Sequence, residues 1–93
     1  MAKPLAGAPW GPPKWDIADA GALQALQRGD AQPHQQQRAL RFIVETLCAT
    51  YDLSYRPDSD RDTAFAEGRR FVGLQLVKLI KANLSTFRRN NDA

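Results

Sequence analysis

The residues that most resemble a ligand set are three aspartates at alternate positions, Asp58, Asp60 and Asp62. This spacing begins the calcium loop of an EF-hand, which also needs glycine at its sixth position and a bidentate glutamate at its twelfth. Those two positions hold Thr63 and Arg69 here, so the sequence excludes that loop. We expect the acids instead at a helix N-terminus, where they satisfy free N–H groups and match the positive end of the helix dipole.

The usual nucleophiles and metal ligands are scarce in this sequence. His34 is the only histidine, so no second histidine can share a metal ion with it. Cys48 is the only cysteine and lies in an apolar segment, where a free thiol is usually a small buried hydrophobe. The sequence has no phosphate-binding loop, dinucleotide fingerprint or nucleophile elbow. We therefore predict a non-enzymatic protein with no catalytic residues, no bound metal and no cofactor.

Composition narrows the class of protein further. The chain has 93 residues, of which 43% are hydrophobic and 25% are charged, which is typical of a single small globular domain. The net charge of +3 is not concentrated in one block, so it provides only weak attraction to polyanions. With one cysteine, no apolar run of about 18 residues and no secretory h-region, we expect a cytoplasmic protein without a membrane span.

Residues 1–15 have the composition of an extended arm rather than of a helix or strand. The segment contains four of the six prolines and two glycines, which favours a polyproline-like conformation. It also carries Trp10 and Trp15, whose large apolar rings need a place to pack. Two alternatives stay open for these rings: they insert into a partner, or they fold back onto the chain's own helices. One ring can also take each role.

Three helices are predicted after the arm. The first spans about residues 16–29, with Asp16 or Asp19 as N-cap and Gly29 as the stop. The second begins at Pro33 and ends near Asp52. The apolar stripe expected to be buried in the second helix comprises Leu40, Ile43, Val44, Leu47 and Tyr51, with Phe42 and Cys48 off its centre.

The last helix is predicted from about Ser59 to Leu84 or Phe87. Its expected buried face comprises Phe65, Val72, Leu76, Leu79 or Ile80, and Asn83 or Leu84. We predict an all-α fold, an antiparallel two-helix hairpin with a short extra N-terminal helix across it and an extended proline-rich arm. The expected organisation is the arm at 1–15, one helical domain at 16–87 and a polar tail at 88–93.

The segment 65–74 is unusual because it places Gly68 and Gly73 inside a strong helix, at a cost of about 1 kcal/mol each relative to alanine. Glycines in such places often admit another backbone, and these two lie on different sides of the helix. We expect one to face the neighbouring helix and the other a second subunit or partner. For Glu67, Arg69 and Arg70 three roles stay open: a surface ion network, an interface patch or a phosphate contact.

The run Phe-Ala-Glu-Gly-Arg-Arg-Phe-Val-Gly-Leu at 65–74, preceded by Tyr55-x-Pro57-Asp58 and an amphipathic helix, resembles a family of small helical proteins of tailed phages, mainly short-tailed ones, and of prophages. The resemblance covers about residues 36–84 and leaves the arm outside. It implies a phage-borne helical protein that is a virion component. The family has no catalytic residues that could be assigned to positions of this chain. The positions that match the motif of this family are Glu67, Gly68, Arg69, Arg70 and Gly73.

Two hypotheses follow for function. The first is a virion or assembly protein, found in the virion and in the host cytoplasm during assembly, that binds in several copies to the portal, tail or DNA-ejection apparatus. Its expected partner-binding residues are Trp10, Trp15, Glu67, Gly68, Arg69, Arg70 and Gly73. The second is a small nucleic-acid-binding accessory protein for packaging or host takeover. Its expected contacts are Arg61, Arg69, Arg70, Lys78, Lys81, Arg88 and Arg89.

Overall fold

A computed structural model describes residues 8–86 of the chain. Its elements are α1 (Ile17–Arg28), α2 (Pro33–Arg41), a π-helix η1 (Phe42–Leu47) that continues α2, and α3 (Asp60–Ile80). No strand occurs within this described range, and the predicted all-α class is confirmed. Phe87 and the predicted tail at 88–93 lie outside the described residues, as does the beginning of the predicted arm.

Helix α1 begins and ends where its sequence predicts. Asp16 is the N-cap and accepts hydrogen bonds from the amides of Ala18 and Asp19, at 3.0 and 3.1 Å. The Asp19 carboxylate accepts in return from the Asp16 amide at 3.1 Å, which completes a capping box. Gly29 closes the helix in the left-handed region at φ 83°, a conformation that glycine adopts without strain.

Helix α1 packs on α2 through small residues and one arginine. Ala22 and Ala25 of α1 and Ala39 of α2 are all buried, and their short side chains let the two helices approach closely. At the edge of this contact, Arg38 of α2 donates to carboxylates at the start of α1, from Nε to Asp19 and from Nη2 to Asp16, both at 2.9 Å. The resulting α1–α2 unit is the best packed part of the described chain.

The second helix ends earlier than the sequence predicts, at Leu47 rather than near Asp52. Its last turns widen to π geometry, with the Cys48 amide bonded to the Ile43 carbonyl at 2.9 Å. Ala49 then takes a positive φ of 49°, which turns the chain out of the helix. The wider turns also rotate the buried face of this segment.

The stripe predicted to be buried in the second helix is therefore largely wrong. The buried residues of this segment are Ala39, Phe42, Val44, Cys48 and Thr50. Leu40, Leu47 and Tyr51, expected inside, are exposed, and Ile43 is half-buried. Phe42 and Cys48, expected off-centre, form the centre of the small apolar core.

Helix α3 begins as predicted, with Ser59 as N-cap accepting from the Asp62 amide at 3.1 Å and with acids in its first turn. It ends at Ile80, short of the predicted Leu84. The Asn83 side chain accepts a hydrogen bond from the Ser85 amide at 3.1 Å, and such a local bond competes with continuation of the helix.

The face that α3 turns toward the rest of the chain is made of small residues. Ala66 and Gly73 are its buried positions. The predicted buried face is wrong, because Phe65, Val72, Leu79, Ile80 and Leu84 are exposed and Leu76 is only half-buried; Asn83, its alternative terminal member, is exposed as well. The large apolar residues of α3 thus lie mostly outside the contact that holds α3 to η1.

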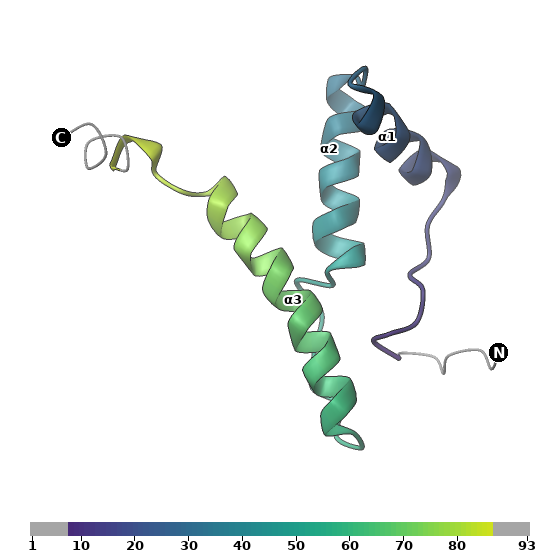
Figure 1. Cartoon of the computed structure of the whole chain (residues 1–93), viewed down its shortest axis with the longest axis vertical. Helices are drawn as coiled ribbons and strands as arrows, with labels where there is room; N and C mark the ends of the chain where they lie inside the picture. The colour runs from purple at the N-terminus through teal and green to yellow at the C-terminus, as the bar shows by residue number, and fades with distance from the viewer. Residues whose placement is uncertain (1–7, 87–93) are drawn as a thin grey trace.

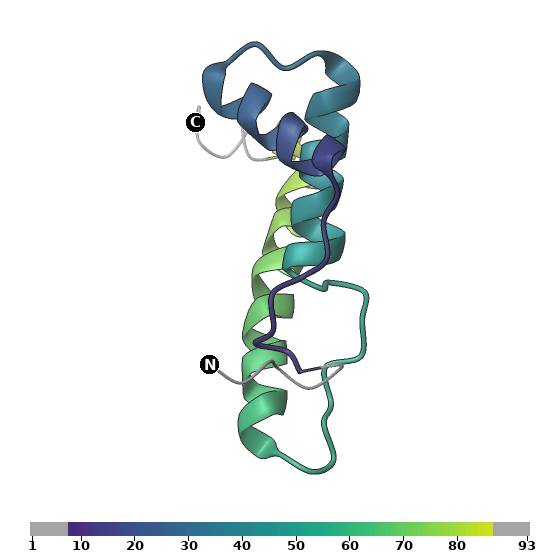
Figure 2. The same cartoon turned by 90° about the vertical axis from the view of Figure 1, so that its right-hand side faces the viewer.

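The chain descends through α2 and η1 and returns through α3, which contacts η1 and diverges from α2 beyond it (Figure 1). Figure 2 shows residues 8–15, which form no helix or strand, running from α1 past η1 toward α3. The radius of gyration is 16.7 Å, whereas a compact chain of this length has about 12 Å. The accessible surface of 7643 Å² likewise exceeds the roughly 5,400 Å² of a compact monomer of this mass. The fold is open.

Candidate functional site

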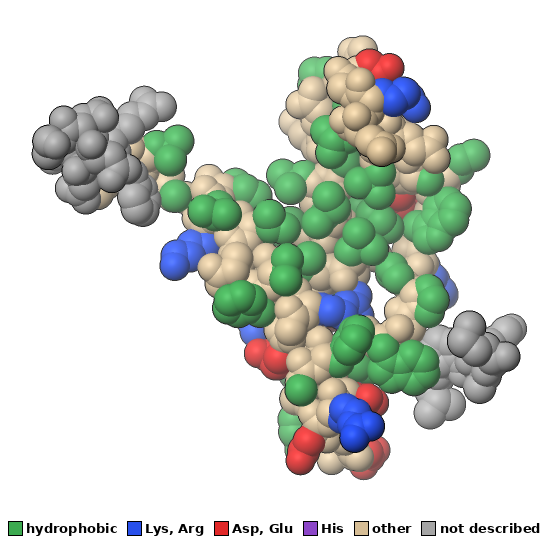
Figure 3. Space-filling model, viewed as in Figure 1, with side chains coloured by type: hydrophobic (Ala, Val, Ile, Leu, Met, Phe, Trp, Pro, Cys, Tyr) green, Lys and Arg blue, Asp and Glu red, His purple; other side chains and the backbone are tan. Residues whose placement is uncertain are grey.

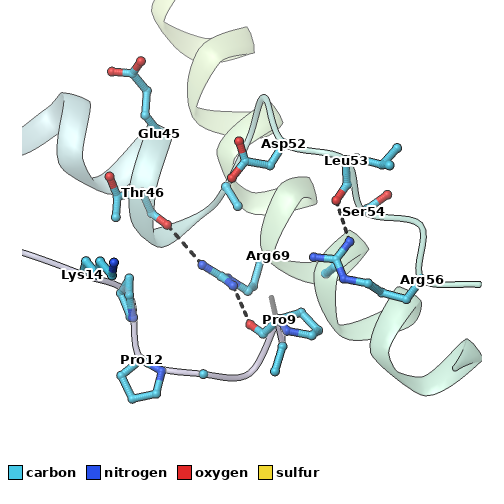
Figure 4. A pocket seen from close by; sticks show the side chains of 15 residues that line it. Pro9, Pro12, Lys14, Glu45, Thr46, Asp52, Leu53, Ser54, Arg56 and Arg69 are labelled. Carbon is cyan, nitrogen blue, oxygen red and sulfur yellow. Dashed lines mark hydrogen bonds between the residues drawn. The ribbon is translucent and has the colours of Figure 1, made fainter. Parts of the chain in front are cut away.

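Arg69 of α3 joins three segments that are far apart in sequence. Its Nε donates to the Leu47 carbonyl at 2.9 Å and its Nη2 to the Thr46 carbonyl at 3.1 Å. Both carbonyls belong to the C-terminal end of η1, where helix carbonyls lack intrahelical partners. Its Nη1 donates to the Pro9 carbonyl and so holds the arm against the helices (Figure 4). One guanidinium therefore fixes the junction of α3, η1 and the arm.

Arg70 extends this junction toward the buried Thr50. Its Nε donates to the Thr50 carbonyl at 3.1 Å, and its Nη1 lies 3.5 Å from an oxygen of Glu67. The Thr50 hydroxyl in turn donates to the Val44 carbonyl at 2.6 Å. The ion pair is partly exposed and contributes little stability, so the main role of Arg70 is to cap the turn after η1.

Gly73 lets α3 approach the end of η1 closely, as a glycine inside a helix suggests. A Cβ built on Gly73 would lie 1.7 Å from the Thr50 hydroxyl oxygen and 2.9 Å from the Cβ atoms of Thr50 and Cys48. Gly68 is different, because a Cβ built there has nothing within 4 Å. The expectation that one glycine faces the neighbouring helix applies to Gly73, and the partner expected at Gly68 stays a prediction.

The charged residues of the motif thus act in a way that sequence reasoning missed. Two arginines donate mainly to backbone carbonyls, a role outside the three that the sequence left open. Thr50, which packs directly against Gly73, carries no functional prediction from the sequence. A sequence signal existed: a helix that ends inside an apolar segment leaves carbonyls that need donors, and a neighbouring arginine pair can supply them.

A second charged cluster, around Asp16, stabilises the α1–α2 contact. Hydrogen bonds from the Asp19 and Ala18 amides and the charge of Arg38 hold the pKa of the Asp16 carboxyl below its usual value, with the Asp19 amide as the largest cause. The hydrogen bond to Asp19 and the charges of both acids raise the pKa of Arg38. This cluster is a structural clamp, since its groups bond to one another.

The two tryptophans of the arm lie on its surface. Trp10 is 52% exposed and Trp15 is 64% exposed, whereas the adjacent Pro9 is buried. Neither ring is folded into the core of its own chain. Between the arm, η1 and the loop before α3 lies a mainly polar cavity of about 360 Å³, with the Lys14, Asp52 and Arg56 side chains on its wall (Figure 4).

An apolar groove opens where α2 and α3 diverge. Its volume is about 370 Å³, similar to the first cavity, but its lining is largely hydrocarbon. The apolar residues that line it are Leu40, Val44, Tyr51, Val77 and Ile80. Hydrophobic side chains gather over α3 and in the opening between the two helices (Figure 3). This groove and the exposed side of α3 are the surfaces best suited to bind another protein.

The residues proposed for nucleic-acid contact do not gather on one face in the described structure. Arg69 and Arg70 are engaged with carbonyls of their own chain. Arg61, Lys78 and Lys81 are exposed on α3, but a helix turns by about 100° per residue, which spreads them over about 160° of its circumference. Arg88 and Arg89 lie outside the described residues.

Comparison with known proteins finds no family model, curated protein or solved structure that matches this chain. Within residues 8–86, no group of three or more histidine, cysteine or acidic side chains is placed to hold a metal ion. None of the helices in that range is long and apolar enough to cross a membrane.

Proposed function

We propose that this protein is a non-enzymatic component of a tailed-phage particle that docks in several copies on the portal, tail or DNA-ejection apparatus. Two kinds of evidence support the two parts of the proposal. The open fold and its exposed apolar surfaces support docking to protein partners. The resemblance of the Glu67–Leu74 segment to small phage proteins supports the phage context.

The observation that carries the docking role is the division of apolar residues between core and surface. Within residues 8–86 the buried hydrophobic residues, apart from Pro9, are four alanines with Phe42, Val44 and Cys48. Most large apolar side chains are exposed, far more than isolated surface leucines would explain. They are Trp10, Trp15, Ile17, Leu26, Leu40, Leu47, Tyr51, Leu53, Tyr55, Phe65, Phe71, Val72, Leu74, Leu79, Ile80 and Leu84. Burial of these side chains against partners would give the chain the core that it lacks alone.

The geometry suggests how docking works. The α2–η1 segment and α3 act as an open antiparallel hairpin, braced at its closed end by Arg69 and Arg70. The groove at its open end receives an apolar segment of the partner. The arm, held at Pro9, presents Trp10 and Trp15 beside this body as anchors, because aromatic rings contribute strongly to interfaces.

Mass spectrometry of purified particles tests the role directly. We expect the protein at a fixed stoichiometry, and its absence from particles would refute the proposal. The variant Ile80→Asp, in the groove, should lower incorporation at least tenfold while helix content stays unchanged. Gln27→Asp, an exposed position on α1, is the matched control and should incorporate normally.

Deletion of residues 1–15 tests the arm separately. Incorporation should fall while the helix content of the remaining chain is retained, since the arm contributes no helix before Ile17. Normal incorporation of the truncated chain would show that the tryptophans are not anchors. The double change of Trp10→Ala and Trp15→Ala separates the rings from the Pro9 contact, which it leaves intact.

A further inference from the structure

Gly68 belongs to a regular stripe on the side of α3 that faces away from η1. Phe65, Gly68, Val72, Gln75 and Leu79 follow one another at spacings of three and four residues, which is the a/d pattern of a helix that packs along another helix. All five are exposed in the single chain, with Phe65 at 48%, Val72 at 52% and Leu79 at 70%. The sequence therefore encodes a helix-packing seam that the described chain leaves uncovered.

The seam is distinct from the face that holds α3 to its own chain. That inner face is made by Ala66, Gly73 and the groove residues Val77 and Ile80. Gly73 is explained by the close approach of Thr50, whereas Gly68 has open space in front of it. Gly68 costs about 1 kcal/mol of helix stability and has no neighbour among the described residues of its own chain, so it leaves room for a neighbour from outside.

We propose that the seam binds the α3 helix of a second copy, in antiparallel orientation, with the two-fold axis beside Val72. This inference rests on the proposed function, since it names one of the partners. In such a pair Val72 meets its symmetry mate, and Phe65 lies opposite Leu79 because both are seven residues from the axis. Gly68 lies opposite Gln75 and Leu76, and its missing side chain makes room for them.

Charge selects the antiparallel orientation. Residues 58–67 hold four acids and a single arginine, whereas residues 68–81 hold four basic residues and no acid. An antiparallel pair places the acidic first turns of each α3 beside the basic last turns of the other, and a parallel pair would oppose like charges. Lys78 and Lys81 are exposed and form no ion pair within residues 8–86, so the basic end of α3 keeps its charge to attract the acidic end of the other copy.

The apolar area suits a stable dimer. Phe65, Val72 and Leu79, the large apolar residues of the seam, together expose about 300 Å² of side-chain surface per copy, and Phe71 beside the seam exposes about 100 Å² more, given the usual areas of such residues. A standard interface covers about 800 Å² per partner, of which somewhat more than half is apolar. The seam therefore supplies about two thirds of the apolar area of a standard interface, and flanking residues such as Phe71 can supply the rest.

Sedimentation equilibrium of the full chain tests the proposal without any phage partner. We expect a dimer for the natural sequence and a monomer for Val72→Asp, which places two carboxylates at the two-fold axis. Leu74→Asp is the matched control, because Leu74 lies on the same helix about 160° from Val72 and should leave the dimer intact. Circular dichroism should show unchanged helix content in both variants.

Two glycine substitutions test whether Gly68 makes room for the second copy. Gly21 in α1 and Gly68 both have open space around a built Cβ, so alanine at either site should leave the single chain unstrained. Gly68→Ala should raise the dimer dissociation constant about tenfold by filling the seam, and Gly21→Ala should leave that constant unchanged. An unchanged dimer dissociation constant for Gly68→Ala would show that the second copy does not pack closely against Gly68.

Spin labels at Lys81→Cys, in a Cys48→Ala background, report the orientation. Residue 81 is nine positions from the axis and half a turn from Val72 around the helix, so both labels lie on the outer sides of the pair. The antiparallel pair separates the two label sites by about 27 Å along the helices and about 20 Å across them, or about 34 Å in all, against about 20 Å for a parallel pair. A monomeric natural chain, a dimer that survives Val72→Asp, or the short label distance would each overturn the inference. None of these results bears on whether the protein is found in particles, which the mass spectrometry decides.

Discussion

Alanine at Gly73 should destabilise this protein, although alanine is normally the better residue inside a helix. The new methyl group would lie 1.7 Å from the Thr50 hydroxyl oxygen and 2.9 Å from two Cβ atoms. The hydroxyl cannot turn away without losing its 2.6 Å hydrogen bond to the Val44 carbonyl, and Thr50 is only 1% exposed. The clash therefore has to be relieved by moving α3 away from η1.

The size of the loss in the free energy of unfolding follows from two unfavourable contributions and one favourable contribution. Overpacking a filled site costs about 1–3 kcal/mol, and a lost buried hydrogen bond about 1 kcal/mol. The better helix propensity of alanine returns about 1 kcal/mol. The free energy of unfolding should therefore fall by about 2 kcal/mol, which for a domain of this size lowers Tm by about 10 °C.

Urea and thermal unfolding followed by circular dichroism measure this change. Gly21→Ala is the matched control, because its helix position is open and the substitution should raise stability by up to about 1 kcal/mol. Thr50→Ala combined with Gly73→Ala should cost less than the sum of the single changes, since the hydroxyl is the nearest clashing atom. A Gly73→Ala variant as stable as the natural protein would show that η1 and α3 do not pack as described.

Three further perturbations have defined outcomes. Arg69→Lys should lower the free energy of unfolding by about 2 kcal/mol in urea titrations, because one ammonium cannot reproduce three directed hydrogen bonds. The pKa of Asp16 is depressed by folding, so its contribution is complete above the unfolded value and is lost as pH falls through the folded one; Asp16→Asn should flatten the acid limb of Tm against pH. Ser59→Ala should cost about 1 kcal/mol in thermal unfolding through loss of the α3 N-cap.

The ends of helices were predictable where the signal is local. Asp16, Gly29, Pro33 and Ser59 act at their own positions through capping and backbone preference, and the structure places the helix ends there. The early end at Leu47 was not predictable in this way. It depends on donors from Arg69 and Arg70, which come from another helix.

The sequence by itself determined that the chain is helical, where most of its helices begin, and that α3 carries an apolar stripe with period near 3.5. Only the tertiary structure decided which apolar residues are buried. Hydrophobic periodicity shows that an apolar stripe tends to be buried, but it does not show which element buries it. Helix α3 has two sides that could pack against the rest of the chain. The small residues Ala66 and Gly73 take the inner side because they let the backbones of α3 and η1 approach. The large residues are therefore left on the outside, and the stripe that looked like a core is a surface.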